Sequence, residues 1–159
     1  MGLFKKAKAL FGTSEDYAVV ELSGAKHHLK GEGIRVPFQG LPLQISLGCD
    51  DNKLHLFPEH LIKSSPQEIP PSFILFNPEH FYSRISGFIR LERDKKLVLG
   101  RSDPEQTALF SYSDRVNERH LAVTNLGDAL IFKDLHSDAG ATLSALKEPD
   151  QIQRLTRRR

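Results

Sequence analysis

Short apolar runs alternate with glycine, proline, asparagine and aspartate along most of the chain from Tyr17 onward. Runs this short, without full helices between them, predict a β-sandwich or barrel and argue against a parallel α/β sheet. The runs that we predict to be strands are Tyr17–Leu22, Ile34–Phe38, Leu43–Leu47, Leu54–Phe57, Phe73–Phe76, Ile85–Leu91, Leu97–Gly100, Leu109–Tyr112, Leu121–Thr124, Ala129–Phe132 and Thr142–Leu146.

Residues 3–11 follow a helical pattern instead. Their apolar side chains fall within about a third of a helical wheel, and Lys5, Lys6 and Lys8 lie off that stripe. We predict a short basic amphipathic helix, which either makes weak contact with an anionic membrane surface or packs on its own domain or frays. Myristoylation of Gly2 is rejected, because that motif requires Ser or Thr at the position of Lys6.

A proline-rich stretch, residues 63–71, reads as a connector between a β-rich N-terminal part, residues 17–62, and a second β-rich part, residues 73–147. Residues 1–12 are assigned to the amphipathic helix and residues 148–159 to a basic helix or linker. Similar phrases at residues 56–60 and 75–80 each run from a strand into Pro-Glu. Two exits from a strand into a helical turn explain this likeness, with an internal repeat as the alternative.

Composition narrows the class of protein further. A length of 159 residues suits one domain, and the net charge of +2 comes from lysines and arginines gathered near the two ends. The chain has no tryptophan and no basic run interleaved with aromatics, so no nucleic-acid partner is expected. With a single cysteine, Cys49, and neither a leader pattern nor a long apolar stretch, we expect a cytoplasmic protein without disulfide or transmembrane helix.

Patterns that indicate catalysis or metal binding are missing from the sequence. The seven histidines have no cysteine partners and no paired helical spacing with a glutamate between them. The chain also lacks a Gly-x-Ser-x-Gly elbow, a phosphate-binding loop ending in Lys-Ser/Thr and a dinucleotide-binding Gly-x-Gly-x-x-Gly. We therefore expect no enzyme activity, no cofactor and no metal.

Three pieces of the second half carry the candidate chemistry. Residues 97–101 form an apolar run ending in Gly100-Arg101, residues 116–123 form a loop with Asn117, Arg119 and His120 before another run, and residues 130–142 end in a polar turn with Gly140. A tetrahedral dianion is best held by a guanidinium group together with short donors from adjacent loops. Loops at one end of a sandwich would bring these three pieces together.

These pieces resemble the forkhead-associated (FHA, or SMAD/FHA-like) domain family, whose marks are Gly-Arg after an early strand, Ser-x-x-His, and an Asp-Leu-x-Ser-x-Asn-Gly-Thr turn. The resemblance covers residues 85–146. It implies an antiparallel β-sandwich that takes part in signalling by binding phosphothreonine-containing peptides or proteins through its apical loops.

Carried over to this chain, the family's phosphopeptide-binding positions are Arg101, Asn117, Arg119, Ser137 and Asp138, and its loop scaffold is Gly100, His120 and Gly140. By the same resemblance Arg101 grips the phosphate, His120 braces the loops and Ser137 supports the turn. Four positions depart from the family's pattern: Asn117 replaces a serine, Ala139 replaces an asparagine, Ala141 replaces the threonine after Gly140, and Asp138 puts a carboxylate beside the phosphate position. The alternative is a degenerate FHA-like scaffold or regulatory domain that binds a partner or an attached catalytic domain without phosphate.

The family follows its Asn-Gly-Thr turn with several further strands, whereas 17 residues follow Thr142 here. Residues 33–57 show the same succession of short apolar runs as those later strands, including an Ile-x-Leu-Gly motif at residues 45–48. We therefore predict that residues 33–57 pair with strands of residues 85–146 and complete the sandwich in a permuted order. The alternative is that the chain is a fragment of a longer protein with a further C-terminal domain.

Overall fold

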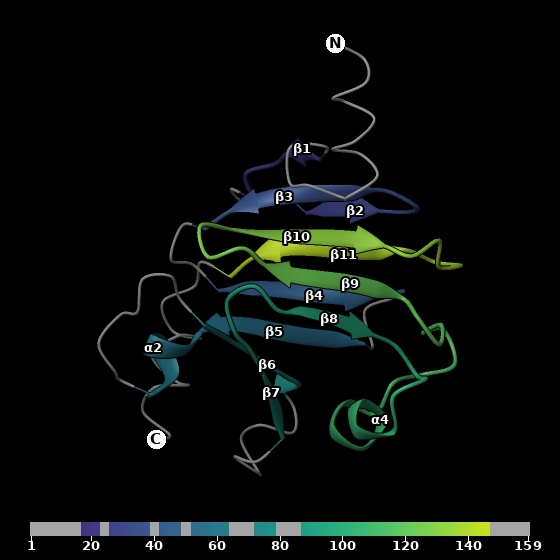
Figure 1. Cartoon of the computed structure of the whole chain (residues 1–159). Helices are drawn as coiled ribbons and strands as arrows, with labels where there is room; N and C mark the ends of the chain where they lie inside the picture. Colours follow the sequence, from purple (N-terminus) through teal and green to yellow (C-terminus); the bar gives the residue numbers. More distant parts are fainter. Residues whose placement is uncertain are drawn as a thin grey trace.

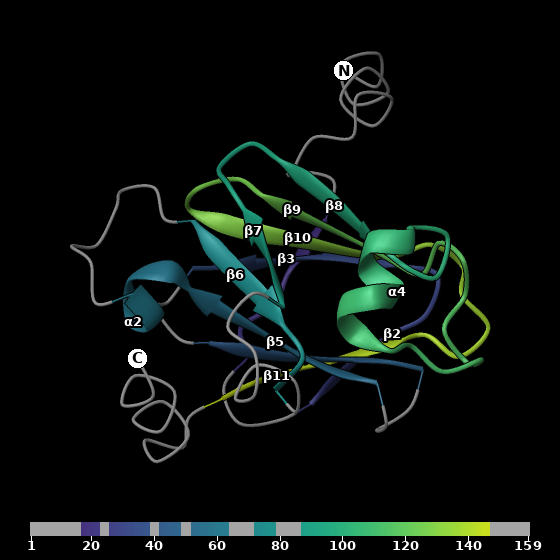
Figure 2. The same cartoon turned by 90° about the horizontal axis from the view of Figure 1, so that it is seen from below.

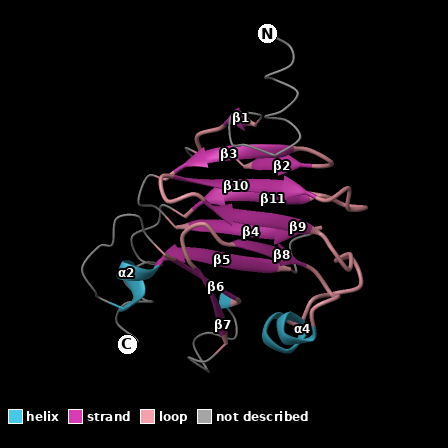
Figure 3. Cartoon of the chain, viewed as in Figure 1, coloured by secondary structure: helices cyan, strands magenta, loops and turns pink. Residues whose placement is uncertain are grey.

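The computed structural model describes residues 17–22, 26–38, 42–48, 52–63, 72–78 and 87–146. Two β-sheets form most of these residues, with the short helices α2 (Glu59–Lys63) and α4 (Pro104–Phe110) at their ends (Figures 1 and 3). The predicted amphipathic helix at residues 3–11, most of the connector and the predicted C-terminal helix or linker lie outside the described residues.

The first sheet has five strands in the order β1-β3-β10-β9-β8, and the second has six in the order β2-β11-β4-β5-β6-β7. Neighbouring strands are antiparallel except for β1 and β3, which are parallel. The strands of the five-stranded sheet are β1 (Ala18–Val19), β3 (Gly33–Pro37), β8 (Lys96–Leu99), β9 (Leu121–Asn125) and β10 (Ala129–Asp134). Those of the six-stranded sheet are β2 (His27–Leu29), β4 (Leu43–Leu47), β5 (Lys53–Pro58), β6 (Phe73–Phe76), β7 (Phe88–Leu91) and β11 (Ala141–Ala145).

Alternation along the strands builds a core between the two sheets. In β3, for example, Ile34 and Val36 are buried, while Arg35 between them is partly exposed. One continuous apolar cluster joins side chains of both sheets, among them Phe132 from the five-stranded sheet and Ile45 and Leu75 from the six-stranded sheet. The molecule is therefore an all-β sandwich of two mainly antiparallel sheets, and this part of the sequence-based prediction is confirmed.

The two halves of the sequence share both sheets. In the five-stranded sheet β3 pairs with β10, and in the six-stranded sheet β4 pairs with β11. Residues 33–57 thus pair with strands of residues 85–146, as the succession of apolar runs predicted. The two halves also meet in the six-stranded sheet where β5, the last strand of the first half, pairs with β6, the first strand of the second half.

A second apolar cluster covers part of the outer face of the six-stranded sheet. It contains Phe57, Ile74, Phe76 and Leu146, each no more than 8% exposed, with Leu61 of α2 packed against it. Because successive side chains of a strand point to opposite faces, β5 and β6 are buried on both sides. This explains why both strands read as continuous apolar runs.

One predicted strand is wrong. Leu109–Tyr112 begins within α4 and not in a strand. The Asp103 side chain caps the helix by accepting from the Glu105 N–H at 3.0 Å, and Pro104 occupies the first turn. The helix buries Phe110 in the core, so the apolar residues at its end are a helical face.

One further strand was not predicted, whereas the predicted helical turn after β5 is present. The strand β2 was not predicted, because His27 and His28 show no apolar alternation, and it is defined by its pairing with β11. The predicted exit from a strand into a helical turn is present where β5 ends and α2 begins at Glu59. The corresponding Pro78-Glu79 exit lies largely outside the described residues.

Candidate functional site

Loops from the three motif pieces gather at one end of the sandwich. We call residues 100–103, 116–120 and 135–140 the apical loops; they follow β8, precede β9 and connect β10 to β11. Figure 2 shows these loops and α4 at one end, with α2 at the other. The strands thus bring Arg101, Asn117 and the 135–140 turn to the same edge of the two sheets.

Gly100 allows the first two apical loops to lie against each other. A Cβ atom at Gly100 would lie 2.1 Å from the Glu118 carbonyl oxygen, so no larger residue fits. The Arg101 N–H donates to the Asn117 carbonyl at 3.1 Å, and the Ser102 N–H donates to the Glu118 carbonyl at 3.1 Å. Glycine is therefore required at position 100 because the two loop backbones approach each other closely there, and not because the position needs a left-handed φ.

His120 holds the second loop to the third. Its ring is fully buried; Nδ1 accepts from the Asn117 N–H at 3.0 Å, and Nε2 lies 2.6 Å from the Gly140 carbonyl oxygen. These partners fix a neutral ring with the proton on Nε2, which donates to Gly140. His120 is therefore a scaffold residue, in keeping with the bracing role that the resemblance implies.

The 135–140 turn is built around a buried carboxylate. Asp134 is fully buried, and its carboxylate accepts from the Ser137 hydroxyl at 2.5 Å and from the Gly31 N–H at 2.6 Å. The Ser137 hydroxyl also accepts from the Gly140 N–H at 2.8 Å. Ser137 is only 4% exposed, so its hydroxyl supports the turn and is not available to a ligand.

Gly140 needs glycine for two reasons. Its φ of +76° is in the left-handed region, and a Cβ atom there would lie 2.3 Å from the Leu29 carbonyl oxygen. The turn is thereby held closely against β2.

Asn117 and Asp138 hold each other. The Asn117 Nδ2 donates to the Asp138 carboxylate at 3.4 Å, and the Asp138 N–H donates to Asn117 Oδ1 at 3.2 Å. The Asp138 carboxylate is exposed. The side-chain amide of Asn117, a candidate phosphate donor, is therefore already used within the loops.

Arg101 and Arg119 present their charges to solvent. The Arg101 Nε donates to the Val116 carbonyl oxygen, and the two terminal nitrogens of the guanidinium form no hydrogen bond with a described residue. Both arginines are exposed, and neither forms an ion pair within the described part of the chain. In particular, Arg101 is not paired with Asp138 or Glu118.

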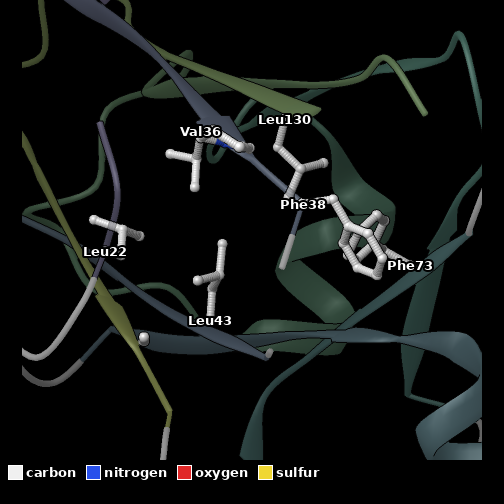
Figure 4. A pocket seen from close by; sticks show the side chains of 8 residues that line it. Leu22, Val36, Phe38, Leu43, Phe73 and Leu130 are labelled. Carbon is white, nitrogen blue, oxygen red and sulfur yellow. The ribbon is translucent and has the colours of Figure 1, made fainter. Parts of the chain in front are cut away.

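The small cavity between the sheets lies at the opposite end of the sandwich. Apolar side chains from both sheets line it, among them Val36, Leu43 and Leu130 (Figure 4). Its volume is about 20 Å³, room for roughly one water molecule, and its lining gives that water few polar partners. This cavity is a packing defect of the core and not a ligand site.

The described residues show two further features. No group of three or more His, Cys, Asp or Glu side chains in them is arranged to hold a metal ion. None of the helices in the same residues is long and apolar enough to span a membrane.

Comparisons with family models, with curated proteins and with solved structures found no match to the chain. The class that the geometry defines is thus a two-sheet β-sandwich with an apical cluster of loops.

Sequence reasoning overlooked two residues that shape this end of the molecule. Asp134 is the buried acceptor for the turn, and its Asp-x-x-Ser spacing to Ser137 was a readable signal for a side-chain-supported turn. Gln106 is 1% exposed and binds the edge of β8 through its side chain. No local pattern signals that role, because it depends on where α4 packs.

Proposed function

We propose that this chain is an FHA-type protein-interaction module whose apical loops bind phosphothreonine-containing peptides or proteins. The observation that carries the proposal is the exposed guanidinium of Arg101, which has no acidic partner among the described residues and lies on loops that His120 and Asp134 hold in place. A guanidinium with free terminal nitrogens donates two parallel hydrogen bonds to a phosphate. Arg119 adds a second positive charge from the neighbouring loop.

The strand pairing supports the resemblance to the FHA family beyond the motifs themselves. The family's further strands follow its Asn-Gly-Thr turn, whereas β3 and β4 here precede the motifs and pair with β10 and β11. We propose that the chain has the family's sandwich in a permuted order. The apical loops then occupy the same end of the sandwich as the family's binding loops.

A second function is favoured by one specific observation. The Asn117 amide is bound to Asp138, and Ala139 offers no side-chain donor, so fewer donors face a phosphate than the family's pattern provides. In this alternative the loops dock a partner or an attached catalytic domain without phosphate.

Binding of matched phosphothreonine and unphosphorylated peptides, measured by fluorescence polarisation at fixed salt, separates the two functions. Under the proposal the phosphorylated peptides bind more tightly, and Arg101→Ala weakens their binding by about 10- to 100-fold, as expected for a charge-assisted hydrogen-bonding group. Arg101→Ala also removes the hydrogen bond from Arg101 to Val116, which could disturb the loop. Arg119→Ala is therefore a second variant, because the Arg119 side chain forms no hydrogen bond with a described residue of the loops. It is expected to weaken binding by about three- to tenfold.

Arg93→Ala is the matched control. Arg93 is exposed in the turn before β8, at the other end of that strand from Arg101, and its loss changes the net charge equally. Equal binding of the phosphorylated and unphosphorylated peptides, unchanged by Arg101→Ala and Arg119→Ala, would reject phosphate recognition and favour the alternative.

A further inference from the structure

Asn117 lies directly beside both Arg101 and Asp138. Its carbonyl accepts from the Arg101 N–H at 3.1 Å and its own N–H donates to His120 Nδ1 at 3.0 Å. Its side chain makes both bonds to Asp138, at 3.4 and 3.2 Å. All four polar groups of Asn117 are thus engaged, and the residue links the turn that carries Arg101 to the turn that carries Asp138.

Charges of both signs on these loops form no ion pair with a described residue. Asp138 and Glu118 are exposed carboxylates, and neither forms an ion pair with a described residue. The same holds for Arg101 and Arg119. The apical loops therefore offer two cations and two carboxylates without ion pairs to described residues, on two turns that Asn117 joins.

We propose that the apical loops select a bipolar peptide, in which a Lys or Arg side chain lies within a few residues of the phosphothreonine. The phosphate lies on Arg101 and Arg119, and the peptide's cation pairs with the Asp138 carboxylate. This inference rests on the proposed function and names the class of peptide that the site takes.

The charge of Asp138 gives the physical reason. A phosphate dianion bound to Arg101 lies on the loop that Asn117 links to the Asp138 turn, and repulsion by the Asp138 carboxylate weakens the binding of a peptide that carries no cation. A peptide cation placed on Asp138 removes this repulsion and adds an exposed ion pair, which contributes a factor of about 1.5 to 5 in affinity. The preference is expected to shrink as salt is raised, because exposed charges are screened.

The experiment compares three sets of peptides on the full chain by fluorescence polarisation at low and at physiological salt. The peptides share one phosphothreonine and carry Lys and Arg, only neutral residues, or Glu at the flanking positions, and each has an unphosphorylated twin. We expect affinity to fall in the order basic, neutral, acidic, with basic flanks favoured over neutral ones by about two- to fivefold at low salt.

Asp138→Asn tests the assigned carboxylate. The backbone N–H at position 138 still donates to Asn117 Oδ1, and the oxygen of the new side-chain amide can still accept from Asn117 Nδ2. The turn is therefore preserved. We expect this variant to lose the preference for basic flanks and to bind the neutral phosphopeptide more tightly than the unaltered protein does. Asp94→Asn, in the turn at the other end of β8, makes the same change of net charge and should keep the preference.

The outcomes separate the inference from the function on which it rests. Phosphate-dependent binding that is insensitive to flanking charge, or a preference for basic flanks that survives in Asp138→Asn, overturns the inference and leaves the proposed function standing. Binding that does not depend on the phosphate overturns both.

Discussion

At the scale of single residues, His55 is the most unusual side chain of the described chain. It is 8% exposed on the outer face of the six-stranded sheet, with ring centroids 5.9 Å from Phe57 and 5.7 Å from Phe76. Its Nδ1 is buried, and no described residue forms a hydrogen bond with it. Burial, and secondarily the charge of Lys53, lowers the pKa of His55 to about 4.

This lowered pKa predicts that acid destabilises the fold through His55. In the unfolded chain the imidazole takes up a proton near pH 6.5, whereas in the folded chain it stays neutral until about pH 4. The free energy of unfolding therefore falls as pH drops from 6.5 to 4, by about 3 kcal/mol from this group, and is unaffected by it above pH 6.5. His55→Phe removes the group, so the stability difference between variant and parent should grow by about that amount across the window.

Urea unfolding at several pH values measures this difference. Parallel curves for the parent and His55→Phe would show that the ring is not kept neutral by burial.

At the scale of elements, α4 protects the exposed edge of the five-stranded sheet. β8 is the last strand of that sheet, and its Val98 carbonyl and Gly100 N–H have no neighbouring strand to pair with. Gln106 supplies both partners, since its Nε2 donates to Val98 at 2.7 Å and its Oε1 accepts from Gly100 at 3.1 Å. The side-chain amide thus takes the place of a peptide group of a neighbouring strand.

A hydroxyl supports this arrangement. The Tyr112 hydroxyl donates to Gln106 Oε1 at 3.2 Å. Burial, together with the nearby charge of Asp103, raises the pKa of Tyr112 well above its usual range, so the phenol keeps the proton that it donates.

Replacing Gln106 should therefore unfold the edge. Gln106→Leu leaves the partly buried Val98 carbonyl and the buried Gly100 N–H without their partner, and we expect a loss of about 2 to 4 kcal/mol in the free energy of unfolding. Urea unfolding measures the loss, and hydrogen exchange should show the Gly100 amide losing its protection. Ala108→Leu, on the exposed side of the same helix, should change stability by less than about 0.5 kcal/mol.

A full-size loss of stability with the Gly100 amide still protected would mean that Gln106 acts through packing and not through the edge.

The same elements show what the sequence could and could not predict. Strands with alternating or continuous apolar runs, such as β3 and β6, were predicted because burial on one or two faces leaves a pattern in the sequence. The Asp103-Pro104-Glu105 start of α4 was equally readable, but the apolar residues after it favoured a strand. The strand β2 and the role of Gln106 depend on tertiary partners far along the chain, which no local pattern encodes.

The candidate site divides in a similar way. The three motif pieces predicted that Arg101, Asn117 and His120 would lie on loops at one end of the sandwich, and the backbone bonds between these loops confirm that they meet. The pairing of Asn117 with Asp138 could not be read from the residues, because it depends on side-chain geometry between two turns.

At the scale of the whole molecule, the sandwich body begins and ends on neighbouring strands. β2 and β11 are antiparallel partners, with Ala141 opposite Leu29 and Leu143 opposite His27. The end of β11 therefore lies beside the start of β2, close enough for a short turn to join them. β5 and β6, in contrast, are connected through α2 and the proline-rich stretch, so a break after Lys63 lies outside both strands.

This arrangement predicts that the chain tolerates a change of order. A permutant that runs from Ser72 to Leu146, continues through a short Gly- and Asn-containing linker to Lys26, and ends at Lys63 keeps every described strand pairing except that of β1 with β3. Closing a short loop costs little entropy, and β1 contributes only two paired residues, so we expect a folded protein with one cooperative urea transition.

The half-chain makes the opposite prediction. Residues 72–146 alone lack β3, the partner of β10, and β4, the partner of β11, so the core between the sheets would be open to water. Without these partners the fragment should show no cooperative transition, and adding residues 26–63 as a separate chain should restore one. If the fragment of residues 72–146 folds cooperatively by itself, the first half is an addition to a complete domain. If the permutant fails to fold while the parent folds, the order of the strands, and not only their pairing, determines the sandwich.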